Sequence, residues 1–141
     1  MSNGVVEGAV SSRRIGRSIL ALLAGFVVNV ALSVITDFAL QAAGVLPVIG
    51  RGTMNDSQCA LAAAYRALFS VISSYVVARL APYRPMEHAL VGAGIGMVLA
   101  TAGAAATWNR GLGPHWYPVA LIAVALPSGW AGARLWLAQA R

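Results

Sequence analysis

The sequence predicts an all-α fold, an integral membrane bundle of four transmembrane helices with both termini cytoplasmic. Hydrophobic residues make up 59% of the 141 residues and charged residues only 10%, and the mean hydropathy is +0.73. These values are far from those of soluble globular domains. Four apolar segments of membrane-spanning length alternate with short stretches that contain proline or glycine. The arginines gather at the ends of these segments, where membrane topology places them.

The first apolar segment predicts a helix over residues 18–45, ended by Pro47. Residues 1–14 precede it without apolar periodicity, so we expect a flexible N-terminal tail. Residues 18–36 contain no charged side chain, a run longer than the hydrophobic region of a usual signal peptide. We therefore expect a retained membrane anchor rather than a cleaved signal.

The second helix is expected over residues 57–81, since Pro82 opposes its continuation. Asn55, Asp56 or Ser57 can cap its first turn.

The last two helices are expected over residues 85–108 and 116–137, which completes a transmembrane domain over 15–138. Pro127 lies inside the fourth helix, where it removes one backbone hydrogen bond and should cause a kink. The kink could be a hinge or a fixed bend, and the fixed bend is the expectation.

Polar residues recur at intervals of four on one side of the first helix: Asn29, Ser33, Asp37 and Gln41. A carboxylate in a hydrocarbon-length segment costs ~2.5–3.5 kcal/mol on insertion scales, so Asp37 should face protein, water or a counter-charge. Arg66 is the charge inside the second segment. Both residues lie about 15 Å of helix from the connecting loop, at similar depth in an antiparallel hairpin. The sequence therefore predicts an Asp37–Arg66 ion pair.

Serines extend this polar face on the second helix. Ser70, Ser73 and Ser74 follow Arg66 at helical spacing, so they share a broad face with it. We expect these serines to bond their own backbone and to allow close packing. The alternative is a polar transport path.

Small residues at intervals of four predict a packing groove on the third helix. They are Gly92, Gly96, Ala100 and Ala104. We expect this groove to receive another helix of the same bundle rather than a second copy of the chain.

The sequence disfavours nucleic-acid binding, metal binding and catalysis. The net charge is +6, but the arginines form no dense run with interleaved aromatics. The single Cys59 excludes an internal disulfide, and His88 and His115 belong to opposite membrane boundaries. We therefore expect no cofactor, no metal cluster and no enzyme.

The arginine distribution predicts the topology. Seven arginines fall on the side of the termini and two on the other, so the termini should be cytoplasmic. The seven are Arg13, Arg14, Arg17, Arg79, Arg84, Arg134 and Arg141, and the two are Arg51 and Arg110.

Four stretches of the chain resemble small uncharacterised four-helix inner-membrane proteins found in bacteria. They are residues 18–37, 64–66, 79–88 and 113–118, within a resemblance over about 15–137. This resemblance implies a multi-pass protein of a bacterial inner membrane and does not indicate any particular activity. The chain is also superficially similar to small multidrug-resistance transporters, but Asp37 lies near the outer end of its helix and Arg66 can neutralise it.

We expect a non-enzymatic membrane protein whose buried pair stabilises the bundle or an assembly. The alternative is a small proton-linked transporter or channel subunit, with Asp37 as the titrating group. The expected partners are the lipid bilayer and either a second copy or another membrane protein.

Reporter proteins fused to either end of the chain should be active only in the cytoplasm, because of the arginine asymmetry. The measurement compares a cytoplasmic reporter with one that is active only in the periplasm. Periplasmic activity at either terminus would contradict this topology.

Overall fold

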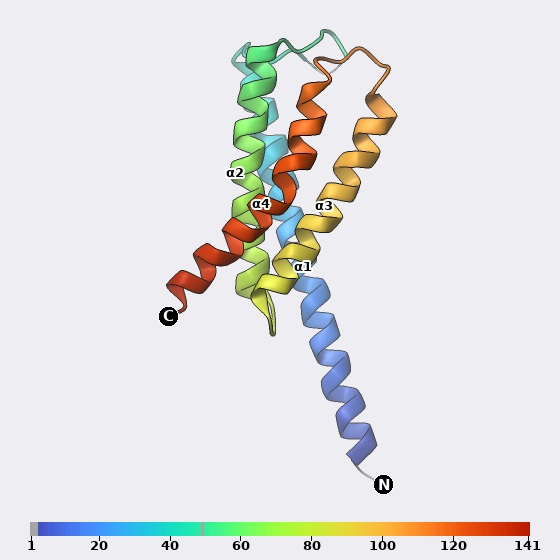
Figure 1. Ribbon diagram of the computed structural model, residues 1–141, viewed down its shortest axis with the longest axis vertical. Coiled ribbons are helices and arrows are strands. Elements are labelled where there is room, and N and C mark those ends of the chain that lie inside the picture. Colours follow the sequence, from blue (N-terminus) through green and yellow to red (C-terminus); the bar gives the residue numbers. More distant parts are fainter. Residues whose placement is uncertain (1–2, 49) are drawn as a thin grey trace.

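The computed structural model describes residues 3–48 and 50–141. These residues form four helices joined by short loops. They are α1 (Asn3–Ala42), α2 (Asp56–Leu80), α3 (Pro85–Thr107) and α4 (Trp116–Gln139). Within this described part there is no strand, which confirms the predicted all-α class. All four helices contain a stretch long and apolar enough to cross a membrane. The start of α1 and the end of α4 lie at the same end of the bundle (Figure 1).

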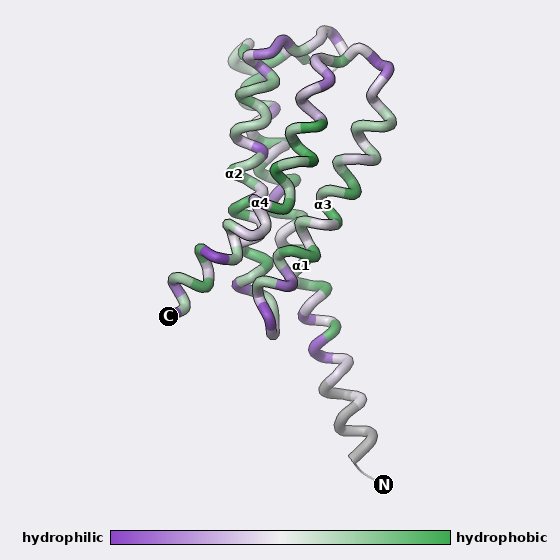
Figure 2. Tube along the Cα trace, viewed as in Figure 1, coloured by the Kyte–Doolittle hydropathy of each residue, from purple (hydrophilic) through white to green (hydrophobic). Residues whose placement is uncertain are grey.

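The burial pattern is that of a protein covered by lipid. The buried core consists largely of small residues, including Ala78, Ala89 and Ala133. Large apolar side chains point outward instead, and Leu20 is 69% exposed and Val98 65% exposed. Figure 2 shows hydrophobic residues along the helices and hydrophilic ones mostly at their ends and in the loops. Such a surface needs an apolar environment, so the fold indicates a membrane protein.

The last three helices begin and end within two residues of their predicted bounds. Asn55 is the cap of α2: its side chain accepts a hydrogen bond from the Gln58 amide at 2.9 Å, and its own amide donates to Gln58 Oε1 at 3.0 Å. This reciprocal pair is a capping box.

The first helix differs from its prediction at both ends. It stops at Ala42 because Gly44, with φ of +72°, closes it. The amide of Gly44 donates to the Gln41 carbonyl and that of Val45 to the Leu40 carbonyl, as in a Schellman motif. At its other end the helix continues back to Asn3, beyond the bundle (Figure 1), where a tail over 1–14 was predicted. Residues 1 and 2 of that predicted tail lie outside the described residues. No proline interrupts its backbone hydrogen bonds.

The close contact between α3 and α4 lies on a different small-residue face from the predicted one. An added Cβ at Gly96 would meet nothing within 4 Å, whereas one at Gly92 would lie 3.3 Å from Leu22 of α1. The predicted face is therefore in close contact at Gly92 and open at Gly96. At Gly129 of α4 an added Cβ would come within 2.5 Å of Ala93 on α3. The spacing of Ala89 and Ala93 is also four residues, and this row faces α4. Small-residue spacing shows that a helix permits close approach, while tertiary packing decides which face is used.

Pro127 lies inside α4, which changes direction along its course (Figure 1). The two residues that follow it, Ser128 and Gly129, are buried. Gly129 packs closely against Ala89 and Ala93 of α3.

Gly132→Ala should lower the melting temperature in detergent sharply. The added Cβ would lie 2.7 Å from both Ser74 Cβ and the Tyr75 amide nitrogen on α2, and overpacking of this kind costs about 1–3 kcal/mol. Gly94→Ala is the matched control, since its Cβ would meet nothing within 4 Å. Equal melting of the two variants would show that α2 and α4 do not pack through Gly132.

Candidate functional site

The candidate site is a polar seam between α1 and α2. Arg66 Nη2 on α2 lies 2.6 Å from Asp37 Oδ2 on α1. The Tyr65 hydroxyl donates a hydrogen bond to the other carboxylate oxygen, Asp37 Oδ1. The Asp37 side chain is 22% exposed and that of Arg66 36% exposed. Both carboxylate oxygens are therefore engaged by neighbouring residues of one helix.

The position of Tyr65 explains how one carboxylate meets two partners. Consecutive residues of a helix point about 100° apart, so Tyr65 and Arg66 approach Asp37 from two directions. Tyr65 was not among the predicted site residues. The signal that could have found it is a phenol next to the predicted arginine, at the same depth as the acid.

The serines of α2 divide between two roles. The Ser70 hydroxyl donates to the Arg66 carbonyl of its own helix at 2.9 Å, as expected for a serine in an apolar helix. The Ser73 hydroxyl instead donates to the Gly25 carbonyl of α1 at 2.7 Å. Ser73 thus adds a second polar link between α1 and α2.

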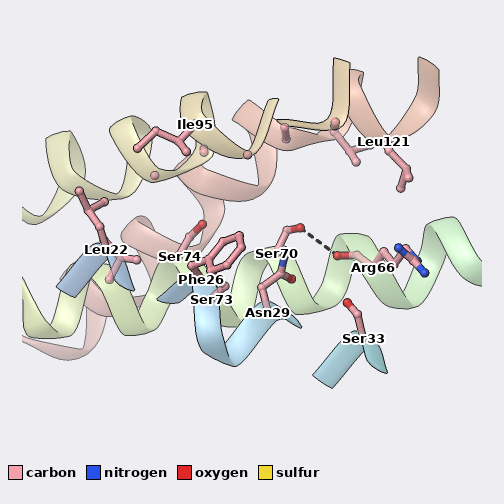
Figure 3. A pocket seen from close by; sticks show the side chains of 17 residues that line it. Leu22, Phe26, Asn29, Ser33, Arg66, Ser70, Ser73, Ser74, Ile95 and Leu121 are labelled. Carbon is pink, nitrogen blue, oxygen red and sulfur yellow. Dashed lines mark hydrogen bonds between the residues drawn. The ribbon is translucent and has the colours of Figure 1, made fainter. Parts of the chain in front are cut away.

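A cavity of about 210 Å³ lies beside this seam, among all four helices. Six of the eight polar residues predicted on the two facing helices line it: Asn29, Ser33, Arg66, Ser70, Ser73 and Ser74. Figure 3 shows these side chains on one side of the cavity and the labelled residues of α3 and α4, Ile95 and Leu121, on the other. Gly92, Gly96 and Ala100 also belong to the lining. Asp37 and Gln41 lie outside it, so the cavity touches the ion pair only through Arg66.

Two polar atoms in this lining are buried and make no hydrogen bond to the described residues. They are Asn29 Oδ1 and Arg66 Nε. One is an acceptor and the other a donor. Buried groups of this kind are normally paired, and here neighbouring protein atoms cover both of them.

A second cavity, of about 420 Å³, lies toward the loop between α3 and α4. Arg66, Ala100 and Leu121 line both cavities. Cys59 and His115 line the second one, although the sequence predicted no shared Cys/His site. His115 Nε2 lies 3.1 Å from the Trp108 carbonyl oxygen, and among the described residues no hydrogen bond joins His115 to Cys59.

The helices α1 and α3 approach each other chiefly at the end of the bundle that carries the termini. There His88 Nε2 lies 2.8 Å from Ser18 Oγ, and an added Cβ on Gly92 would lie 3.3 Å from Leu22. Elsewhere α1 packs mainly on α2. The cavity lies where α1 and α3 diverge.

The site therefore combines an ion pair, its phenol partner and a cavity with one polar wall. Within the described residues, no three His, Cys, Asp or Glu side chains gather as a metal site. No protein-family model, curated protein or solved structure matches this chain.

Proposed function

We propose that this chain is a non-enzymatic, multi-pass protein of a bacterial inner membrane, with both termini cytoplasmic. In this proposal, the Asp37–Arg66 pair joins α1 to α2 and so stabilises the bundle or an assembly with other membrane proteins. The observation that carries it is the double engagement of the Asp37 carboxylate by Arg66 and Tyr65.

The pair matters most for α1, because this helix has few other neighbours. It packs mainly on α2, touches α3 only weakly, and leaves many large apolar side chains exposed. Apolar contacts hold helices together poorly in a bilayer, since lipid tails are equally apolar. Polar links such as Asp37–Arg66 and Ser73–Gly25 therefore make a larger relative contribution here.

The double variant Asp37→Leu/Arg66→Met should be more stable than the sum of its single variants indicates. Removing one partner leaves the other charge uncompensated, which costs ~3–5 kcal/mol in a fully buried pair and less for side chains that are 22% and 36% exposed. Removing both partners is often nearly neutral. The measurement is a double-mutant cycle on unfolding in detergent.

Tyr65→Phe is the matched control, since it removes one hydrogen bond but no charge, at a cost of about 1 kcal/mol. Additive effects of the two single changes would mean that Asp37 and Arg66 do not interact, and this would overturn the structural proposal.

The second candidate is a small proton-linked transporter or channel subunit with Asp37 as the titrating group. The polar wall of the cavity favours it, because Asn29, Ser33, Ser70 and Ser73 lie along one side. The pairing of Asp37 with Tyr65 and Arg66 opposes it, because proton coupling needs a carboxylate that water can reach.

Proteoliposomes containing the protein should therefore hold an imposed pH gradient as long as those containing Asp37→Asn. A pH-sensitive dye inside the vesicles measures the decay. Faster decay with the parent protein than with the variant would favour the transport function over the structural one.

A further inference from the structure

The cavity beside the ion pair has the features of a ligand site. One wall carries hydroxyl, amide and guanidinium groups, and the opposite wall is aliphatic or lacks a side chain. Among the described residues, no hydrogen bond joins the Asn29 or Ser33 side chain of this polar wall to another residue. A hydroxyl group can donate to or accept from either side chain. The volume of about 210 Å³ has room for several waters or a small organic molecule.

The mouth of the cavity lies at the depth of the membrane interior. Phe26 of α1 and Ile95 of α3 both line the cavity and remain 51% and 48% exposed. Ile95 is near the middle of the 23-residue α3, about 15 Å of helix from either end. A molecule that enters between these side chains therefore comes from the hydrocarbon rather than from water.

The charge balance selects against ions. Arg66 is the one charged residue of the lining, and its guanidinium is already paired with Asp37. An anion would have to displace that carboxylate, and a cation would find no free acid in the lining. The polar wall is thus suited to a neutral group.

We infer that this cavity binds a neutral, membrane-soluble molecule with a hydroxyl head on an aliphatic body, which enters between α1 and α3. The head bonds Asn29 on the polar wall, and the body lies against Ile95, Ala100 and Leu121. The inference uses the proposed Asp37–Arg66 pair only to neutralise Arg66.

The probe for this site is an eight-carbon alcohol with a photoreactive diazirine on its chain. Labelling of the full-length protein in lipid vesicles should fall on residues of the cavity lining, mapped by mass spectrometry, and excess octanol should compete with it. The same chain without its hydroxyl should label these residues about two- to tenfold less, as expected for one net hydrogen bond. Asn29→Leu should remove most of this difference between the probes.

Gly96→Leu should abolish the saturable labelling, because its side chain would fill space in which a Cβ meets nothing within 4 Å. Gly94→Leu is the matched control, since Gly94 is on the same helix, is equally open and does not line the cavity. Melting of both variants checks their folding, and Gly96→Ala, which fills less space, should reduce the labelling in part.

Three results would overturn the inference: labelling without saturation, equal labelling by both probes, or equal labelling of the two leucine variants. Each would mean that the cavity holds water or is open to bulk lipid. The parent protein and the variants used for labelling all keep Asp37 and Arg66. A negative labelling result would therefore overturn the ligand site without bearing on the double-mutant cycle that tests the ion pair.

Discussion

The constraint on which this structure depends is that a polar group in hydrocarbon must find its partner inside the protein. The bundle meets it in three ways. Ser70 bonds the carbonyl of its own helix, Ser73 reaches across to α1, and Asp37 takes two partners from α2. These contacts place α1 against α2 at a defined depth and register. The apolar faces alone would leave that register open, because lipid and protein are equally apolar there.

The sequence predicts the helix bounds well where a local breaker acts. Pro82 and the first-turn cap at Asn55 act through the backbone of nearby residues, so no tertiary knowledge is needed to find them. Gly44 also ends α1 through its own backbone conformation. The prediction took Pro47 as the residue that ends this helix, so its predicted end lies three residues beyond the observed one at Ala42. The packing face of α3 is different in kind. Gly96 and Ala93 both belong to rows of small residues, and only the path of α4 decides between them.

The candidate site shows the same division between local and global information. Counting ten residues from Pro47 and from Asp56 pairs Asp37 with Arg66, and the structure brings their charged atoms to 2.6 Å. The two counts are not equal in the structure, because α1 ends at Ala42, five residues beyond Asp37. The sequence did not predict the role of Tyr65, because an aromatic residue in an apolar helix is usually a packing residue. The cavity cannot be predicted from the sequence at all. It exists because α1 and α3 meet at one end and diverge at the other, and no single segment encodes that divergence.

The sequence separation of the ion pair has a consequence for biosynthesis. Arg66 follows Asp37 by 29 residues, which the ribosome adds in roughly 1.5–6 s at about 5–20 residues per second. During that interval α1 carries a carboxylate without its counter-charge, so its release into lipid alone is unfavourable. The helix is therefore best retained at the insertion machinery until α2 emerges. The two would then enter the bilayer together as a neutralised hairpin, and α3 and α4 would assemble on a pair already formed.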